Sequence, residues 1–314
     1  MAKNTAVAVI DIGSNSIKVL VAARVGDSGV APLKTRTIDA RISAGISQAA
    51  PRLTEEGMSR GLDAIRALLA DAAPYSPGRT ALVATSAVRD AQNGADFRER
   101  VRAATGHEIR ILSGGAEANL IGRGLTCDPA LTTLRDFYVF DLGGGSLECL
   151  AFRDRRIEQA VSLQLGCVRL TEKFVADSTQ PLSSAAAHRI ADHTREVFAH
   201  SSFAFTLPPG TTAVGTGGTM ATVRTIRGAR GAQAFEQTNS LISVGELREI
   251  LAALGALPLA ARREIPGLPP ARADVFPVAL ATMISVAEIG GLPSFRNSLY
   301  NLRYGLAAEL LDAT

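Results

Sequence analysis

The sequence predicts an α/β protein made of two similar domains, each with a mixed five-stranded sheet flanked by helices. Strand-forming segments alternate with helical ones along most of the chain. One unit, a strand ending in aspartate followed by a glycine turn and a second strand, occurs twice at a domain-sized spacing. The length of 314 residues also fits about two domains. The repeat therefore predicts two domains facing each other, with the active site in the cleft between them.

The second copy of this unit follows the apolar run Tyr138–Phe140. Its polar and glycine positions are Asp141, Gly143, Gly144, Gly145, Ser146 and Glu148. Consecutive glycines permit unusual backbone angles and let N–H groups approach a bound anion. A carboxylate at a strand end, beside such a turn, suits a site for a metal and phosphate. No helical pattern follows, which argues against a dinucleotide fingerprint, and no Walker loop occurs. An ordinary hairpin is the alternative.

The first copy lies near the N-terminus and has the same order of residue types. Its positions are Asp11, Gly13, Ser14, Asn15 and Ser16, between two strand-forming runs. Two such turns by accident are less expected than one, so the repeat favours a functional role over an ordinary hairpin. Each turn would grip one part of a phosphate chain.

Composition excludes several classes of protein. The chain is 46% apolar and 20% charged with a net charge of +3, which demands neither nucleic acid nor an acidic membrane surface. Three cysteines without CxxC spacing indicate reduced thiols in a cytoplasmic protein. We found neither a leader pattern nor an apolar stretch of membrane-spanning length. We therefore expect a cytoplasmic protein that binds no nucleic acid and no membrane.

The first half is predicted to have the order β-β-β-α-β-α-β-α. Thr54 caps the first helix, Gly106 closes the second and Ser113 leads into the third. Expected strands cover 6–11, 16–24, about 33–42, 80–85 and 107–112. Ligands of such sheets bind at the carboxyl ends of strands, and Asp11, Arg89 and Glu117 all lie at or just past strand ends.

The second half begins with the same meander of three strands. Expected strands cover 137–141, 147–152, about 157–165 and 212–214; expected helices cover 184–202, 220–226, 244–254, 277–290 and 299–311. A glycine-rich loop containing Gly217, Gly218 and Thr219 would open a helix whose N–H groups favour an anion, although a plain strand-to-helix turn is the alternative. Residues 227–240 are polar, which predicts a mobile loop. The predicted domains are 1–127 and 128–314, with the last helix a candidate to pack back on the first.

Taken together, these motifs resemble the exopolyphosphatase and guanosine pentaphosphate phosphohydrolase (Ppx/GppA) family of the actin-like ATPase superfamily, whose domains have the RNase H-like fold. The matching stretches are 10–16, 84–93, 113–118, 141–148 and 215–219. The resemblance covers nearly the whole chain and corresponds to the short two-domain members. It implies an enzyme that releases terminal orthophosphate from inorganic polyphosphate, with Mg²⁺ or alternatively Mn²⁺ as cofactor, acting as a homodimer.

The resemblance also implies roles for individual residues. Glu117 matches the glutamate that orients or deprotonates the attacking water, and Asp141 and Glu148 match the carboxylates near the divalent metal. The two turns match the phosphate-binding turns. Arg89 and Asn93 match positions that contact phosphate or support the cleft.

The chain departs from the family pattern at a few positions. Ala116 stands where the family has a second acid, Val278 follows Pro277 where glycine is frequent, and Asn301 and Tyr304 alter a C-terminal element. These changes bear on substrate choice more than on chemistry. Three alternatives stay open: a hydrolase of guanosine pentaphosphate (pppGpp), an actin-like kinase or ATPase, and a non-catalytic phosphate-binding protein.

Overall fold

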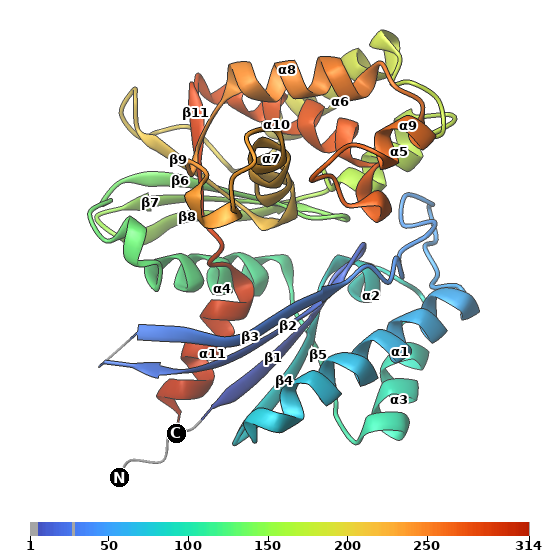
Figure 1. The fold of residues 1–314 in the computed structure, drawn as a ribbon, viewed down its shortest axis with the longest axis vertical. Coiled ribbons are helices and arrows are strands. Elements are labelled where there is room, and N and C mark those ends of the chain that lie inside the picture. The colour runs from blue at the N-terminus through green and yellow to red at the C-terminus, as the bar shows by residue number, and fades with distance from the viewer. Residues whose placement is uncertain (1–5, 27–28, 314) are drawn as a thin grey trace. The chain divides into compact units, whose positions relative to one another are not determined.

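The computed structural model describes residues 6–26 and 29–313. The start of the first predicted domain and the last residue of the second therefore lie outside the described residues. Backbone contacts divide the chain into two compact units, 1–133 with 300–314 and 134–299 (Figure 1). The sequence placed the change of domain after residue 127, whereas the compact units change after residue 133. The C-terminal residues return to the first unit because the last helix packs against its sheet.

The first unit contains a five-stranded sheet with the order β3-β2-β1-β4-β5. β1, β2 and β3 form an antiparallel meander, while β4 and β5 add parallel to β1 and to each other. The strands are β1 (Val7–Ile12), β2 (Ile17–Val25), β3 (Gly29–Ile38), β4 (Arg79–Ala84) and β5 (Ile109–Ile111). This is the mixed sheet that the sequence predicts.

β3 lies about four residues earlier than the sequence predicted. Pairing with β2 through the preceding hairpin fixes its register, and Pro32 falls inside it, opposite Ala22. Proline is tolerated there because β3 is an edge strand, where a missing N–H does not break the ladder.

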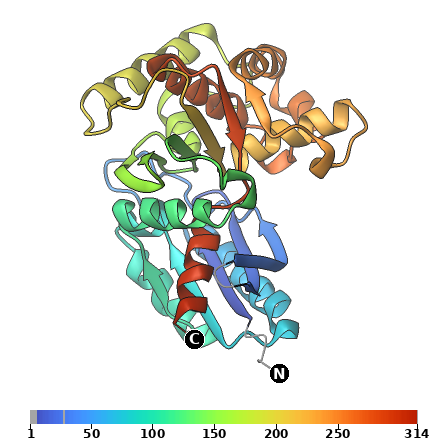
Figure 2. The same cartoon turned by 90° about the vertical axis from the view of Figure 1, so that its left-hand side faces the viewer.

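Helices cover the first sheet in two groups (Figures 1 and 2). α1 packs with α3, and α4 lies side by side with α11. The helices are α1 (Glu55–Ala72), η1 (Ala73–Tyr75), α2 (Ser86–Arg89), α3 (Gly94–Thr105), α4 (Gly114–Thr126), η2 (Pro129–Leu131) and α11 (Leu302–Asp312). The predicted caps are confirmed, since Thr54 accepts from Gly57 N and Gly106 has a φ of 73°.

The second unit repeats this topology with one strand more. Its order is β10-β11-β9-β6-β7-β8, and β8-β7-β6-β9-β11 corresponds to β3-β2-β1-β4-β5. The strands are β6 (Phe137–Leu142), β7 (Leu147–Arg153), β8 (Arg156–Leu163), β9 (Thr212–Thr216), β10 (Leu241–Ser243) and β11 (Ser294–Asn297). The prediction of five strands was therefore wrong for this sheet. β10 has three residues, too few for a visible alternation of polar and apolar positions.

A group of helices packs against this second sheet, with α10 inside the group formed by α5, α6, α7 and α8. The helices are α5 (Cys167–Phe174), α6 (Ser184–Ala199), α7 (Gly217–Arg230), η3 (Phe235–Gln237), α8 (Val244–Gly255), α9 (Leu259–Arg263), η4 (Pro270–Arg272) and α10 (Phe276–Gly290). α10 is apolar nearly all round because it is covered on every side.

Two predictions near α7 need correction. The glycine-rich segment is the end of β9 and the first turn of α7, so the helix begins at Gly217 and not at Met220. The polar stretch after it is ordered by Arg224, whose guanidinium donates to the main-chain oxygens of Phe235 and Thr238, each at 2.9 Å. A buried arginine from α7 thus holds this polar stretch in place, which the local sequence does not indicate.

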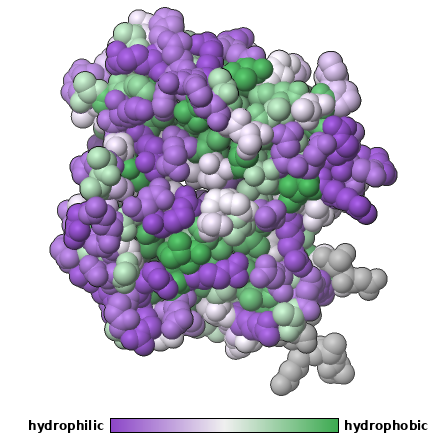
Figure 3. Space-filling model, turned by 180° about the vertical axis from the view of Figure 1, so that it is seen from behind, coloured by the Kyte–Doolittle hydropathy of each residue, from purple (hydrophilic) through white to green (hydrophobic). Residues whose placement is uncertain are grey.

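Most large apolar side chains of the described residues are buried. The face shown in Figure 3 is largely hydrophilic, with smaller hydrophobic areas between the polar ones. Among the exposed exceptions are Val25, Leu33 and Leu299. No helix among the described residues is both long enough and apolar enough to span a bilayer.

Two glycines allow α4 and α11 to approach closely. A Cβ on Gly124 would collide with the oxygen of Asn301, and one on Gly305 would collide with the oxygen of Leu120. The last helix therefore contacts α4 through backbone rather than through long side chains.

Replacing Gly305 by alanine should lower the stability of the first unit, because overpacking a tight contact typically costs about 1–3 kcal/mol. The midpoint of urea unfolding measures this. Gly115→Ala in α4 is the matched control, since its added Cβ meets nothing within 4 Å. A Gly305→Ala midpoint equal to that of the control would contradict the close approach.

Candidate functional site

The first glycine turn joins β1 to β2 and is held from two sides. Gly13 N donates to Ser16 O at 3.2 Å, which closes the turn, and Ser14 Oγ lies 3.2 Å from Ser86 Oγ. Ser43 Oγ donates to Ser14 O, and Arg41 N donates to Asn15 O. These bonds occupy the carbonyl oxygens of the turn and fix its shape.

Asn15 is the most informative side chain of this turn. It is 6% exposed, and neither its Oδ1 nor its Nδ2 has a hydrogen-bond partner among the described residues. A buried polar atom left unpaired costs about 1–3 kcal/mol, so native proteins rarely keep one without a reason. The amide can donate one hydrogen bond and accept another, which fits contact with a polar ligand.

Glu117 lies in the first turn of α4, whose N-cap Ser113 accepts from Ala116 N. It is 7% exposed, and its Oε2 lies 3.4 Å from Arg89 Nη1. Arg89 also donates to Leu112 O at 3.0 Å and to Asp90 Oδ1 at 3.2 Å. The structure therefore brings Glu117 and Arg89 together, with Arg89 placed to orient the carboxylate.

The side-chain amide of Asn93 is used in hydrogen bonds to the main chain. Its Oδ1 accepts from Leu53 N at 2.8 Å and its Nδ2 donates to Leu53 O at 2.9 Å. Both ends of the amide thus bind the main chain just before α1. Of the two roles predicted for Asn93, these bonds fit support of the cleft rather than contact with phosphate.

The second glycine turn closes in the same way as the first, with Gly143 N donating to Ser146 O at 3.0 Å. Its carbonyl oxygens face the start of α5. Cys167 N and Val168 N donate to Gly143 O and Gly144 O at 3.0 and 2.9 Å, and Arg169 Nε donates to Gly145 O at 2.9 Å. The N–H groups at the start of α5 are therefore used by the turn.

The three glycines of this turn are not required by a left-handed backbone angle. None of Gly143, Gly144 and Gly145 has a left-handed φ, contrary to the first reason that the sequence offered. Gly166 packs directly on Gly144 and Gly145, and a Cβ on Gly166 would collide with their backbone. Close approach of two backbone segments therefore explains the glycine at position 166.

The strand register of the second sheet lines up four polar residues across four strands. Asp141 on β6 pairs with Glu148 on β7, Glu148 pairs with Ser162 on β8, and Asp141 pairs with Thr216 on β9. Directly opposed residues share one face of a sheet. We call Ser162, Glu148, Asp141 and Thr216 the acidic row. Two carboxylates are thus neighbours on one face.

The equivalent row of the first sheet has a different charge. There Asp11 pairs with Lys18, Lys18 with Thr37, and Asp11 with Val83. A lysine therefore stands where the second sheet has Glu148. An opposite-charge pair neutralises itself, whereas two opposed carboxylates are favoured only when positive charge is supplied.

The start of α7 adjoins the acidic row. Gly217 has a φ of 82°, and a Cβ on it would collide with Asp141 Oδ1. Thr219 is fully buried, and its Oγ1 has no hydrogen-bond partner among the described residues. Free N–H groups at a helix start favour an anion, so the predicted role of this segment has a suitable geometry.

Arg272 is a residue that the sequence analysis missed. A Cβ on Gly218 would collide with its guanidinium, so this cation lies against the first turn of α7. Its Nε is buried without a partner among the described residues. A single arginine after Pro269 and Pro270 has no periodic pattern, and only the fold shows that η4 brings it to α7.

The donor set of the acidic row fits a hard divalent cation. Mg²⁺ prefers oxygen ligands, and it usually keeps several waters while one or two carboxylates hold it. Asp141 and Glu148 provide such a pair. No group of three or more histidine, cysteine or acidic side chains that could hold a metal occurs among the described residues. Water and phosphate oxygens would complete the coordination.

The neighbouring cysteines are not reactive thiols. Cys149 and Cys167 are buried and free, and burial raises the pKa of both. For Cys149 the negative charge of Glu148 raises the pKa further. Both thiols therefore stay protonated at neutral pH.

Comparison with a protein-family model decides the classification. The model of the Ppx/GppA phosphatase family matches residues 20–314. The chain belongs to the Ppx/GppA phosphatase family. The resemblance seen in the motifs is thereby confirmed.

Solved structures agree with the fold of this Ppx/GppA phosphatase. An exopolyphosphatase from Cytophaga hutchinsonii is similar, with a TM-score of 0.88, 24% identity and coverage of 99% of both chains. A PPX-GPPA enzyme from Aquifex aeolicus has a TM-score of 0.77 and 22% identity, covering 97% of this chain and 99% of its own.

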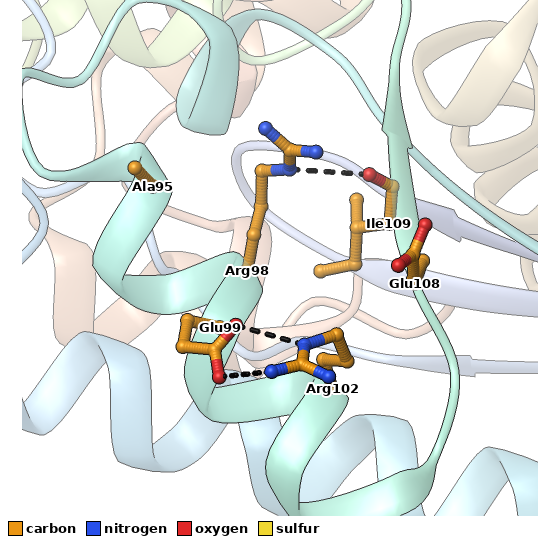
Figure 4. A pocket seen from close by; sticks show the side chains of 6 residues that line it. All are labelled: Ala95, Arg98, Glu99, Arg102, Glu108 and Ile109. Carbon is orange, nitrogen blue, oxygen red and sulfur yellow. Dashed lines mark hydrogen bonds and ion pairs between the residues drawn. The ribbon is translucent and has the colours of Figure 1, made fainter.

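A pocket of about 230 Å³ lies elsewhere in the first unit of this phosphatase, where α3 meets β5 (Figure 4). Arg102 pairs with Glu99, and Arg98 Nε donates to Ile109 O at 3.2 Å. None of the predicted site residues lines this pocket. We therefore leave it out of the candidate site.

Gly217→Ala should strongly reduce phosphatase activity, since the methyl group would displace the Asp141 carboxylate. We expect a loss of at least about tenfold, which corresponds to about 1.4 kcal/mol. Gly210→Ala is the matched control, because Gly210 has a similar φ of 81° but an added Cβ meets nothing within 4 Å.

Thermal unfolding should show a similar penalty from backbone strain in both variants. Activity should fall in Gly217→Ala alone. Equal activity in the two variants would show that Asp141 takes no part in the reaction.

Proposed function

We propose that this Ppx/GppA phosphatase is an exopolyphosphatase, which releases terminal orthophosphate from inorganic polyphosphate by metal-assisted attack of water. The observation that carries the proposal is the acidic row, where Asp141 directly opposes Glu148 on one face of the sheet. The equivalent pair in the first sheet, Asp11 and Lys18, is neutral in sum. This difference between the two sheets favours a cation site in the second unit and not in the first.

Asp141 and Glu148 would hold the cation, most simply Mg²⁺, with Mn²⁺ as the alternative. A bound divalent ion neutralises charge on the transferring phosphoryl group. Glu148 is 2% exposed and Asp141 is half-buried, so water screens the repulsion between the two carboxylates only in part and a bound cation would offset it. The affinity of the pair for a small hard cation follows from that burial.

Glu117 would direct the water. In the proposed step the water oxygen forms a bond to the terminal phosphorus while the bond to the bridging oxygen breaks. The terminal phosphorus leaves as orthophosphate, and the shortened polyphosphate keeps the bridging oxygen. The Glu117 carboxylate takes the proton of the water. Arg89, 3.4 Å from Glu117 Oε2, would keep that carboxylate in place.

The remaining phosphates of the chain would bind to N–H groups and side chains of the turns. The unpaired amide of Asn15 supports this role in the first unit. In the second unit, Arg272 and the start of α7 together provide positive potential for a phosphate.

We further propose a cytoplasmic homodimer, as the family resemblance implies. The free, protonated cysteines support a reducing compartment. Sedimentation of the purified protein tests the oligomeric state.

Glu117→Gln should lower the rate of phosphate release from polyphosphate by about 10²–10⁴-fold, the usual contribution of a positioned acid or base. The amide keeps the size of the side chain, so thermal stability should change little. Glu108→Gln, an exposed glutamate of the same unit, is the control and should retain full activity. Release from Glu117→Gln near the wild-type rate would remove Glu117 from the mechanism.

A panel of substrates identifies the preferred phosphate chain. With Mg²⁺, phosphate release should be faster from polyphosphate, long or short, than from pppGpp and ATP, and it should stop when EDTA removes the metal. Faster release from pppGpp would identify pppGpp as the substrate in place of polyphosphate and would leave the proposed hydrolysis unchanged. Transfer from ATP to an acceptor, or tight binding without release, would refute the hydrolase.

A further inference from the structure

Ser162 on β8 completes the acidic row beside Glu148. Its Oγ donates to Glu148 Oε1 at 2.7 Å, and the two residues are directly opposed in the register of β7 and β8. The local sequence, Val161 to Gly166, does not mark this serine as functional. Its position comes from the strand pairing alone.

Glu148 needs such a partner for a physical reason. Its buried carboxylate stands opposite Asp141, and two like charges at opposed positions repel. A glutamate also has three side-chain torsions, so it can turn away from a neighbouring charge. A hydroxyl donor that binds one carboxylate oxygen at short distance limits that freedom.

The first sheet shows that this arrangement is specific to the acidic row. The residue equivalent to Ser162 is Thr37, which is exposed and opposes Lys18. The hydroxyl occurs in both rows, but only in the second does it oppose a carboxylate. Strand packing alone therefore does not require the contact between Ser162 and Glu148.

We propose that Ser162 is a positioning residue that holds the Glu148 carboxylate beside Asp141, so that the pair can bind a divalent cation. This inference rests on the proposed function, because it takes Asp141 and Glu148 as the cation ligands. Partners that orient metal ligands typically change metal affinity by about 10–100-fold when removed. The role is distinct from catalysis, since Ser162 acts only through Glu148.

The test compares three variants of the full chain: Ser162→Ala, Ser162→Thr and Ser285→Ala. Ser285 is the matched control, because it is buried in the same unit and its Oγ donates to Ala281 O at 2.9 Å, within α10. Mn²⁺ binding without substrate is measured by electron paramagnetic resonance. The Mg²⁺ dependence of phosphate release and thermal unfolding are measured on the same samples.

We expect Ser162→Ala to weaken Mn²⁺ binding about tenfold or more and to raise the Mg²⁺ concentration for half-maximal release by a similar factor. Ser162→Thr, which keeps a hydroxyl, should recover most of the affinity. Ser285→Ala should bind Mn²⁺ like the wild type even if its unfolding temperature falls.

Two outcomes overturn the assignment of Ser162 alone: wild-type Mn²⁺ affinity in Ser162→Ala, or no recovery in Ser162→Thr. A wild-type protein that releases phosphate but binds no Mn²⁺ overturns the cation site and, with it, this inference. A wild-type protein that binds Mn²⁺ but releases no phosphate refutes the hydrolase and leaves the effect of Ser162 on Mn²⁺ binding as the deciding measurement.

Discussion

The pairing register of β6 with β7 is the constraint on which the candidate site depends. Side chains alternate between the two faces of a strand, so a slip of one residue would move Glu148 away from Asp141 and onto the opposite face. The short turn closed by Gly143 and Ser146 fixes this register. Gly166 and the start of α5 then hold the turn in place. A rigid hairpin thus keeps two like charges together.

The two units show how a duplicated fold can divide its tasks. Both have the same strand order and the same closed turn between their first two strands. The charge of the row differs between them, because Lys18 in the first sheet corresponds to Glu148 in the second. A change of charge at that position converts a neutral pair into a pair that attracts a cation. The fold stays the same, because both residues lie at the end of a strand.

Buried arginines organise the irregular parts of the second unit. Arg262 is 2% exposed and donates to the oxygens of Ala273, Ser178 and Gln180 at 2.7 to 3.0 Å. Burial lowers its pKa, which shows the cost of removing the charge from water. Several hydrogen bonds offset that cost. The bond to Ala273 also fixes η4, and so the neighbouring Arg272.

The sequence by itself determined the elements that local chemistry defines. The capped helix after Thr54, the two aspartate-and-glycine hairpins and the order of strands and helices along the first unit follow from hydrophobic periodicity and turn residues. Tertiary structure decided what depends on residues far apart in the chain. The sixth strand, the approach of Arg272 to α7 and the contact of Ser162 with Glu148 all belong to this group. Local patterns encode which residues form a strand, but strand pairing and close packing decide which side chains meet.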